Sequence, residues 1–204
     1  MNSLEYEMIE LLKVLKEKYG VFEIKAEYEN EGSRQAELMR LKDVAEKLDL
    51  PIILKIGGVE AVTDIYNALA LGVKGIIAPM AETGFAASKF LDAIDTFVPE
   101  DNQKDIEFAI NIETITAYKN LDEILSLKKL KLLTSLTVGR VDFGGSLRAD
   151  RSFSNSDEML KYCSEIFQKA KSKNLKTALG GAIATEAIPF IKKLNSDKLI
   201  DKYE

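Results

Sequence analysis

This sequence of 204 residues contains no histidine. Catalysis by Ser-His-Asp or Cys-His groups is therefore excluded, as are the H-E-x-x-H zinc motif and histidine acid–base chemistry. A metal site in this chain has to use oxygen ligands, and such ligands favour Mg²⁺, Mn²⁺ or Ca²⁺ over zinc.

Cysteine, net charge and long apolar runs are also scarce. A single cysteine cannot form an internal disulfide, which indicates a reducing compartment such as the cytoplasm. Lys and Arg number 28 against 33 Asp and Glu, and the resulting net charge of -5 argues against nucleic-acid binding. No apolar run approaches the roughly 18 residues of a membrane span, and the acidic start at residues 1–7 is not a secretion signal. We therefore expect a cytoplasmic protein without nucleic-acid or membrane partners.

What the sequence does have is a regular alternation of strand-like and helix-like segments. We expect one domain over residues 1–204, in which residues 1–19 form an N-terminal helix. Strict alternation predicts parallel strands joined by right-handed crossovers, as in a doubly wound sheet or a (β/α)₈ barrel. No G-x-G-x-x-G follows the first strand, and polar residues gather where strands end. The expected fold is therefore α/β, a TIM-type (β/α)₈ barrel.

The number of expected strands falls short of eight. Strands are expected at Val21–Glu29, Ile52–Ile56, Gly75–Met80, Ile106–Glu113, Leu133–Val141 and Lys176–Gly180, and a seventh is expected to begin at Lys198–Ile200. Helices are expected at Ser3–Tyr19, Ser33–Asp49, Thr83–Phe97, Ala117–Leu127, Ser156–Lys173 and Thr185–Leu194. One more helix is expected after Gly58, ending at Leu71. A closed barrel needs eight strands, so either the barrel is incomplete at its C-terminal strand or a neighbouring chain completes it.

Alternation along each strand separates a face under the helices from a face in the barrel lumen. In the fourth expected strand, the apolar face consists of Ile106, Phe108, Ile110 and Ile112, and in the first strand of Phe22, Ile24 and Ala26. The opposite face carries polar residues, which would line the lumen: Glu23, Lys25, Glu27, Lys55, Asn111 and Glu113. Buried charges are costly unless they are paired or bind metal, so this set suggests a site.

These polar residues have structural alternatives. We interpret Glu23 and Lys25 as an internal ion pair low in the barrel. Glu27, Lys55 and Glu113 lie at or near the carboxyl ends of strands, where a barrel carries its active site, so a functional role is favoured for them.

Five short segments occur in a specific order. They are K-A-E-Y-E at 25–29, K-I-G-G at 55–58, A-P-M-A-E-T at 78–83, N-I-E-T at 111–114 and G-R-V-D at 139–142. In this order, over residues 21–190, the sequence resembles the HpcH/HpaI aldolase/citrate lyase family, within the phosphoenolpyruvate/pyruvate-domain barrels.

The resemblance implies a homo-oligomeric carbon–carbon lyase that depends on a divalent metal. Its small-molecule substrate would be a 2-oxo acid or related oxyacid, cleaved through a metal-stabilised enolate. Mg²⁺ or Mn²⁺ would be bound by Glu113 and Asp142, which match the family's ligand positions. Lys55 stands where the family normally has Arg, and would contact the substrate oxygens as a point charge. Where many family members carry a loop histidine for proton transfer, this sequence has residues 27–29, Glu-Tyr-Glu.

Each candidate residue therefore has a proposed role beside a structural one. Glu27 is a candidate general base, or the ion-pair partner of Lys25 or Lys55. Asn111 either positions a substrate oxygen or makes a strand-end hydrogen bond. Glu113 and Asp142 are either metal ligands or partners of nearby backbone amides. Arg140 contacts the substrate, supports Asp142 or is a salt-bridge partner. Gly144 either lets the backbone approach the substrate closely or forms part of a tight turn.

Two functions from other classes remain open at this point. One is a non-catalytic barrel that binds a small acidic ligand or serves as an assembly subunit. The other is a metal-free aldolase in which a desolvated Lys55 forms a Schiff base.

Overall fold

A computed structural model describes residues 1–204 and contains one curled sheet of seven strands. All neighbouring strands are parallel, and their order in the sheet is their order in the chain. The strands are β1 (Ile24–Glu27), β2 (Ile52–Lys55), β3 (Gly75–Ala78), β4 (Glu107–Ile112), β5 (Ser135–Gly139), β6 (Lys176–Gly180) and β7 (Lys202–Tyr203). The expected α/β architecture with an incomplete barrel is confirmed.

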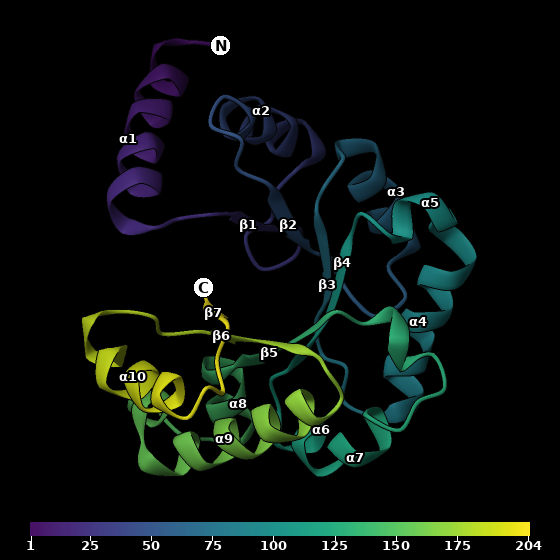
Figure 1. The fold of residues 1–204 in the computed structure, drawn as a ribbon. Coiled ribbons are helices and arrows are strands. Elements are labelled where there is room, and N and C mark those ends of the chain that lie inside the picture. Colours follow the sequence, from purple (N-terminus) through teal and green to yellow (C-terminus); the bar gives the residue numbers. More distant parts are fainter.

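Helices follow the strands and cover the outer, convex side of the sheet, except α1, which precedes β1 and lies beside α2 (Figure 1). They are α1 (Ser3–Tyr19), α2 (Gln35–Glu46), α3 (Val62–Leu71), α4 (Gly84–Phe97), α5 (Glu100–Gln103), α6 (Ile115–Lys119), α7 (Leu121–Ile124), α8 (Arg140–Ser146), α9 (Asp157–Ser172) and α10 (Ile188–Ser196). Three short 3₁₀ helices lie between them: η1 (Leu130–Leu132), η2 (Arg151–Asn155) and η3 (Thr185–Ala187). None of the helices combines the length and hydrophobicity that crossing a bilayer requires.

The two faces of the sheet divide as the alternation predicts. The main hydrophobic core holds 42 buried residues, among them Phe108, Ile110 and Ile112 of β4. A separate cluster of three buried residues, Ile53, Ile77 and Ala109, fills the lumen side. The lumen side is therefore apolar at these positions of three neighbouring strands, while the same face carries polar side chains elsewhere, among them Lys55, Asn111 and Thr137.

Capping side chains set several helix ends. Asn2 accepts a hydrogen bond from the Glu5 amide in a capping box, and Ser156 caps α9 through the Met159 amide. Gly72 ends α3 in the left-handed conformation that glycine adopts without strain. The helix expected to start at Ser33 begins later, because Arg34 is its cap residue and α2 starts at Gln35.

Three further expectations differ from the structure. The helix expected at 117–127 is two short helices, because the chain leaves helical geometry at Asn120. The fifth strand ends at Gly139, and the residues expected to continue it begin α8 instead. The seventh strand forms at Lys202–Tyr203, beyond the residues 198–200 expected to begin it.

The curled sheet has one open side, between β1 and β7. A cavity of about 850 Å³ lies there, lined by residues at the end of α1, on β1 and on α10. Lys25 on β1 bridges the opening to Glu204 (2.5 Å), and Lys202 on β7 bridges it to Glu23 (2.5 Å). The predicted pairing of Glu23 with Lys25 is therefore wrong, because each residue meets an opposite charge on the far strand instead.

Removing one partner of a bridge across the opening should destabilise the fold. We expect Lys25→Met to lower the free energy of unfolding by about 1–3 kcal/mol, because the Glu204 carboxylate, only 11% exposed, loses its partner. Urea denaturation measures the change. Lys176→Met is the matched control, since its ion pair with Glu107 has the same 2.5 Å length but its side chain is 63% exposed. The control should lose less than about 1 kcal/mol. Equal losses in the two variants would contradict a special role for the bridge.

Candidate functional site

A buried carboxylate occupies the carboxyl end of the sheet. Glu113 directly follows β4 and is only 3% exposed. One of its oxygens accepts a hydrogen bond from the Met80 amide (2.9 Å), and the other accepts from Asn111 Nδ2 (3.0 Å). An ionised carboxylate has about four acceptor positions, so both oxygens keep capacity for a further partner.

The space for this carboxylate comes from a glycine on the next strand. A Cβ atom at Gly139 would lie 2.7 Å from Glu113 Oε2 and 2.9 Å from its Cβ. Any larger residue at the end of β5 would therefore displace the Glu113 side chain. The backbone of β5 and the side chain of Glu113 are fitted to one another.

Asp142 supplies a second acidic group at the same end of the sheet. It lies in the first turn of α8, is exposed, and its carboxylate accepts no hydrogen bond from the protein. Its negative charge acts on both Glu113 and Lys55, so Asp142 lies within electrostatic reach of both side chains. No group of three or more acidic or cysteine side chains is placed to hold a metal ion. Mg²⁺ is commonly bound by only one or two carboxylates, with water or substrate completing its shell.

The environment of Glu113 makes its ionised form costly. Burial raises the pKa of Glu113, and the charge of Asp142 adds to this effect. The hydrogen bonds from Met80 and Asn111 and the charge of Lys55 act in the opposite direction, but the pKa remains above its ordinary value. A cation between Glu113 and Asp142 would relieve this cost, so the two residues fit a divalent metal ion.

Lys55 and Glu27 form an ion pair beside these carboxylates. Lys55 ends β2, Glu27 ends β1, and the two residues are register partners in the sheet. Burial acts to lower the pKa of Lys55, but the hydrogen bond to Glu27 and the charges of Glu27, Glu113 and Asp142 raise it overall. Lys55 is therefore a positively charged ammonium at neutral pH, with donors beyond the one used by Glu27.

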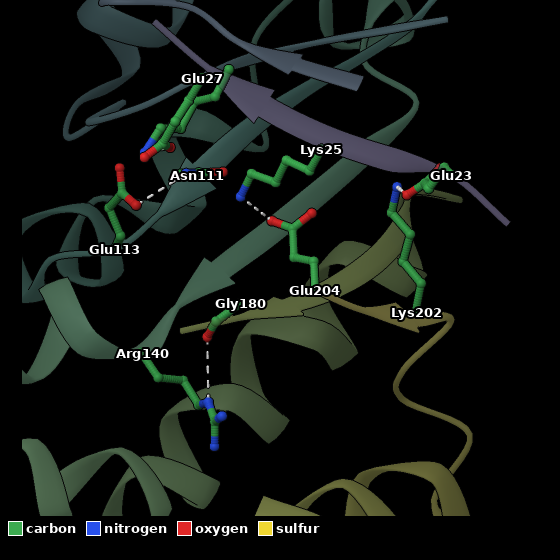
Figure 2. A network of polar contacts seen from close by, with 10 residues as sticks. Glu23, Lys25, Glu27, Asn111, Glu113, Arg140, Gly180, Lys202 and Glu204 are labelled. Carbon is green, nitrogen blue, oxygen red and sulfur yellow. Dashed lines mark hydrogen bonds and ion pairs between the residues drawn. The ribbon is translucent and has the colours of Figure 1, made fainter. Parts of the chain in front are cut away.

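Asn111 presents an unused acceptor inside the barrel. It is only 3% exposed, and because its Nδ2 donates to Glu113, its Oδ1 must point elsewhere. That Oδ1 is the one buried side-chain polar atom without a hydrogen-bond partner. Figure 2 shows Glu27, Asn111 and Glu113 together on the lumen side of the sheet. A buried acceptor without a donor is costly, so this position suits a ligand that donates a hydrogen bond.

Arg140 and Gly144 lie apart from this group. Arg140 is fully buried, and its guanidinium donates to backbone carbonyl oxygens and to the side-chain oxygen Oδ1 of Asn155. In Figure 2 its side chain extends away from Glu113. Gly144 is buried within α8, 3.4 Å from Phe153 when a Cβ is added, so it belongs to a packed helix and not to a loop turn.

Sequence reasoning missed two contributors. Met80 stands in the A-P-M-A-E-T segment without an expected role, yet it is 48% exposed and its amide donates a hydrogen bond to Glu113. Its φ of 52° is in the left-handed region, which is unusual for a residue other than glycine and is common at functional sites. Gly139 was quoted only as part of a motif. Their positions at the carboxyl ends of β3 and β5, the strands on either side of β4, were the only available signal.

A curled parallel sheet with acidic side chains at the carboxyl ends of its strands defines an α/β protein of the TIM-barrel type. A model of the family described as HpcH/HpaI aldolase/citrate lyase matches residues 40–186. The chain therefore belongs to the HpcH/HpaI aldolase/citrate lyase family.

Solved structures share the fold at low sequence identity. The citrate synthase SbnG has a TM-score of 0.77 and 17% identity over 97% of this chain and 80% of that chain. An HpcH/HpaI aldolase from Desulfitobacterium hafniense DCB-2 has a TM-score of 0.75 and 12% identity, covering 96% and 80%. A family member from Burkholderia cenocepacia J2315 has a TM-score of 0.72 and 13% identity, covering 97% and 82%. No curated protein sequence matches the chain.

The raised pKa of Glu113 predicts how stability depends on pH. A raised pKa in the folded state means that stability is lost as pH rises from the ordinary value of 4.5 through the folded value. Glu113→Gln removes the titrating group, so its stability should not fall over this pH range. The variant should therefore be more stable than the parent at neutral pH without metal. Its amide can still accept from Met80, and can donate to the free Oδ1 of a reoriented Asn111. Unfolding free energies measured across this pH range test the prediction.

Glu7→Gln on the exposed side of α1 is the control and should follow the parent. Parallel pH profiles for the parent and Glu113→Gln would contradict the prediction.

The fit between Gly139 and Glu113 predicts a second stability change. Gly139→Ala should lower the free energy of unfolding by about 1–3 kcal/mol, because the added methyl overlaps Glu113. Gly145→Ala is the matched control, since nothing lies within 4 Å of a Cβ there and the residue is helical. The control should gain about 0.5–1 kcal/mol. If urea denaturation shows both variants to be stabilised, the close contact does not constrain the site.

Proposed function

We propose that this protein is a divalent-metal-dependent carbon–carbon lyase that cleaves a 2-oxo acid or related oxyacid. The observation that carries the proposal is the buried Glu113 carboxylate, within electrostatic reach of Asp142 and Lys55 at the carboxyl end of the sheet in an aldolase-family barrel. Membership in the aldolase/citrate lyase family supports the reaction class. The metal and the substrate are our inference from the side chains.

Glu113 and Asp142 would hold Mg²⁺ or Mn²⁺ through carboxylate oxygens. Hard oxygen donors suit these ions, and both oxygens of Glu113 keep free acceptor capacity. When bound, the ion supplies Lewis-acid stabilisation of negative charge that develops on a substrate oxygen.

The remaining polar groups would bind the substrate and move a proton. The Lys55 ammonium, kept charged by its neighbours, would contact the substrate carboxylate or carbonyl oxygen. Glu27 is hydrogen-bonded to Lys55 and is the leading candidate to accept or return the proton as the carbon–carbon bond breaks. Asn111 Oδ1 would accept a hydrogen bond from a substrate hydroxyl.

Two other residues from the sequence prediction have weaker support as substrate contacts. The guanidinium of Arg140 already donates its hydrogen bonds to carbonyl groups of the protein. Gly144 is buried inside α8. A direct contact with substrate at either position would require the surrounding loops to move.

The raised pKa of Lys55 argues against a Schiff-base aldolase. Imine formation needs the neutral amine, and the surrounding carboxylates of Glu27, Glu113 and Asp142 favour the ammonium. Two of these carboxylates, Glu113 and Asp142, are the groups expected to bind metal. A metal-dependent reaction therefore fits these side chains better than covalent catalysis by Lys55.

We also propose a homo-oligomer in a reducing, cytoplasmic compartment. Large apolar side chains of α1 are exposed, including Leu4 (62%), Leu11 (67%) and Leu15 (41%), and a partner chain would cover them. The single cysteine, Cys163, is a buried free thiol, and burial raises its pKa to about 12, so it is unreactive.

The deciding experiment measures oxaloacetate decarboxylation and pyruvate enolisation with and without Mg²⁺ or Mn²⁺. We expect metal-dependent turnover that falls at least about 100-fold in Glu113→Ala and Asp142→Ala, beyond the range for outer-sphere partners of a metal. Glu186→Ala, an exposed acidic residue on η3, is the control and should retain activity.

Other outcomes would point to other functions. Metal-independent turnover that neither substitution changes would reject the mechanism. Borohydride trapping of pyruvate on Lys55 would favour the Schiff-base aldolase. No turnover together with no bound metal would favour a non-catalytic barrel for a small acidic ligand.

A further inference from the structure

Arg140 is a buried cation without an acidic partner. It is fully buried at the start of α8, and its guanidinium also lies over the Phe190 ring at 4.7 Å. Its five hydrogen bonds go to neutral oxygens: the carbonyls of Gly180 (3.4 Å), Gly181 (2.5 Å), Ala182 (3.1 Å) and Ser154 (2.9 Å), and Oδ1 of Asn155 (2.8 Å). Burying a charge this way is costly, so an arrangement that uses every donor indicates a specific structural task.

The acceptors belong to two segments that border the mouth of the barrel. One is the end of η2. The other is the 180–182 loop, which consists of Gly180, the last residue of β6, and the two residues after it. Within that loop Gly181 and Ala182 both have positive φ values, 75° and 52°. The left-handed conformation costs a residue such as alanine roughly 1–2 kcal/mol, so bonds that hold it are needed. Arg140 supplies two of them, to the carbonyls of these residues.

The same loop contacts the turn that carries Asp142. A Cβ added at Gly181 would lie 3.0 Å from the Val141 amide nitrogen and 3.2 Å from that of Arg140. The loop backbone therefore abuts the first turn of α8, and Asp142 is the next residue along that turn. Arg140 thus holds the loop from the side chain while the loop contacts the backbone of α8.

We propose that Arg140 is a positioning residue, which locks the 180–182 loop against the first turn of α8 and so fixes the place of the Asp142 carboxylate. Figure 2 shows its side chain directed toward Gly180 and away from Glu113, as this role requires. The part of this inference that concerns metal rests on the proposed function, in which Asp142 is a ligand.

The chemistry of the side chain explains why arginine suits this position. A guanidinium has five donors in a rigid plane, whereas a lysine ammonium has three donors at one point. Acceptors on two separate segments can be reached together only by the wider group. Arg140→Lys therefore keeps the charge but should release part of the loop.

The test compares Arg140→Lys with the parent by hydrogen exchange and by Mn²⁺ binding. We expect faster exchange at residues 181–183 and at 141–146, and a Kd for Mn²⁺ raised by about 10–100-fold, the range for outer-sphere partners of a metal. Gly181→Ala perturbs the same contact from the loop side and should give the same two changes. Arg151→Met, which replaces an exposed arginine in η2, is the control and should change neither.

The outcomes separate this inference from the proposed function. Faster exchange confined to 181–183, with Mn²⁺ affinity unchanged, overturns the positioning role. If the parent protein binds no Mn²⁺, the metal proposal fails, and exchange at 141–146 then decides: faster exchange supports positioning and unchanged exchange overturns it. If Arg140→Lys does not fold, Gly181→Ala provides the decision by the same readouts.

Discussion

The cost of burying the Glu113 carboxylate is the constraint on which the mouth of this barrel depends. The carboxylate is almost inaccessible, so every neighbouring element contributes to its support. Met80 adopts an unusual backbone conformation that directs its amide at the carboxylate, and Gly139 leaves the space it needs. The charge of Lys55 compensates only in part, because the Asp142 carboxylate opposes it. A cation beside the carboxylate would relieve this residual cost.

Much of the fold and part of the site follow from local pattern. Alternation along the strands correctly placed Glu27, Lys55 and Glu113 on the lumen side, because an apolar face must pack under helices. The ion-pair partners of the charged residues could not be derived from alternation. Lys25 meets Glu204, 179 residues further along the chain, and no local property of either residue indicates that distance.

Boundaries were missed where a short local preference competes with tertiary contacts. The residues from Leu133 to Val141 have the pattern of one strand. In the structure the strand ends at Gly139 and α8 begins at Arg140, whose side chain is buried and donates to the loop after β6. The placement of Met80 likewise depends on Glu113, a residue on the adjacent strand, which the sequence around Met80 does not reveal.

The match between strand order and chain order bears on how this protein is made. Each strand adds beside its predecessor, so a chain emerging from the ribosome can extend the sheet stepwise without waiting for distant segments. The bridges from Lys25 to Glu204 and from Glu23 to Lys202 each join residues 179 positions apart, and they form only after synthesis has passed these positions. Until then Lys25 and Glu23 lack these partners, so the charges beside the first strand are neutralised only once the seventh strand has been made.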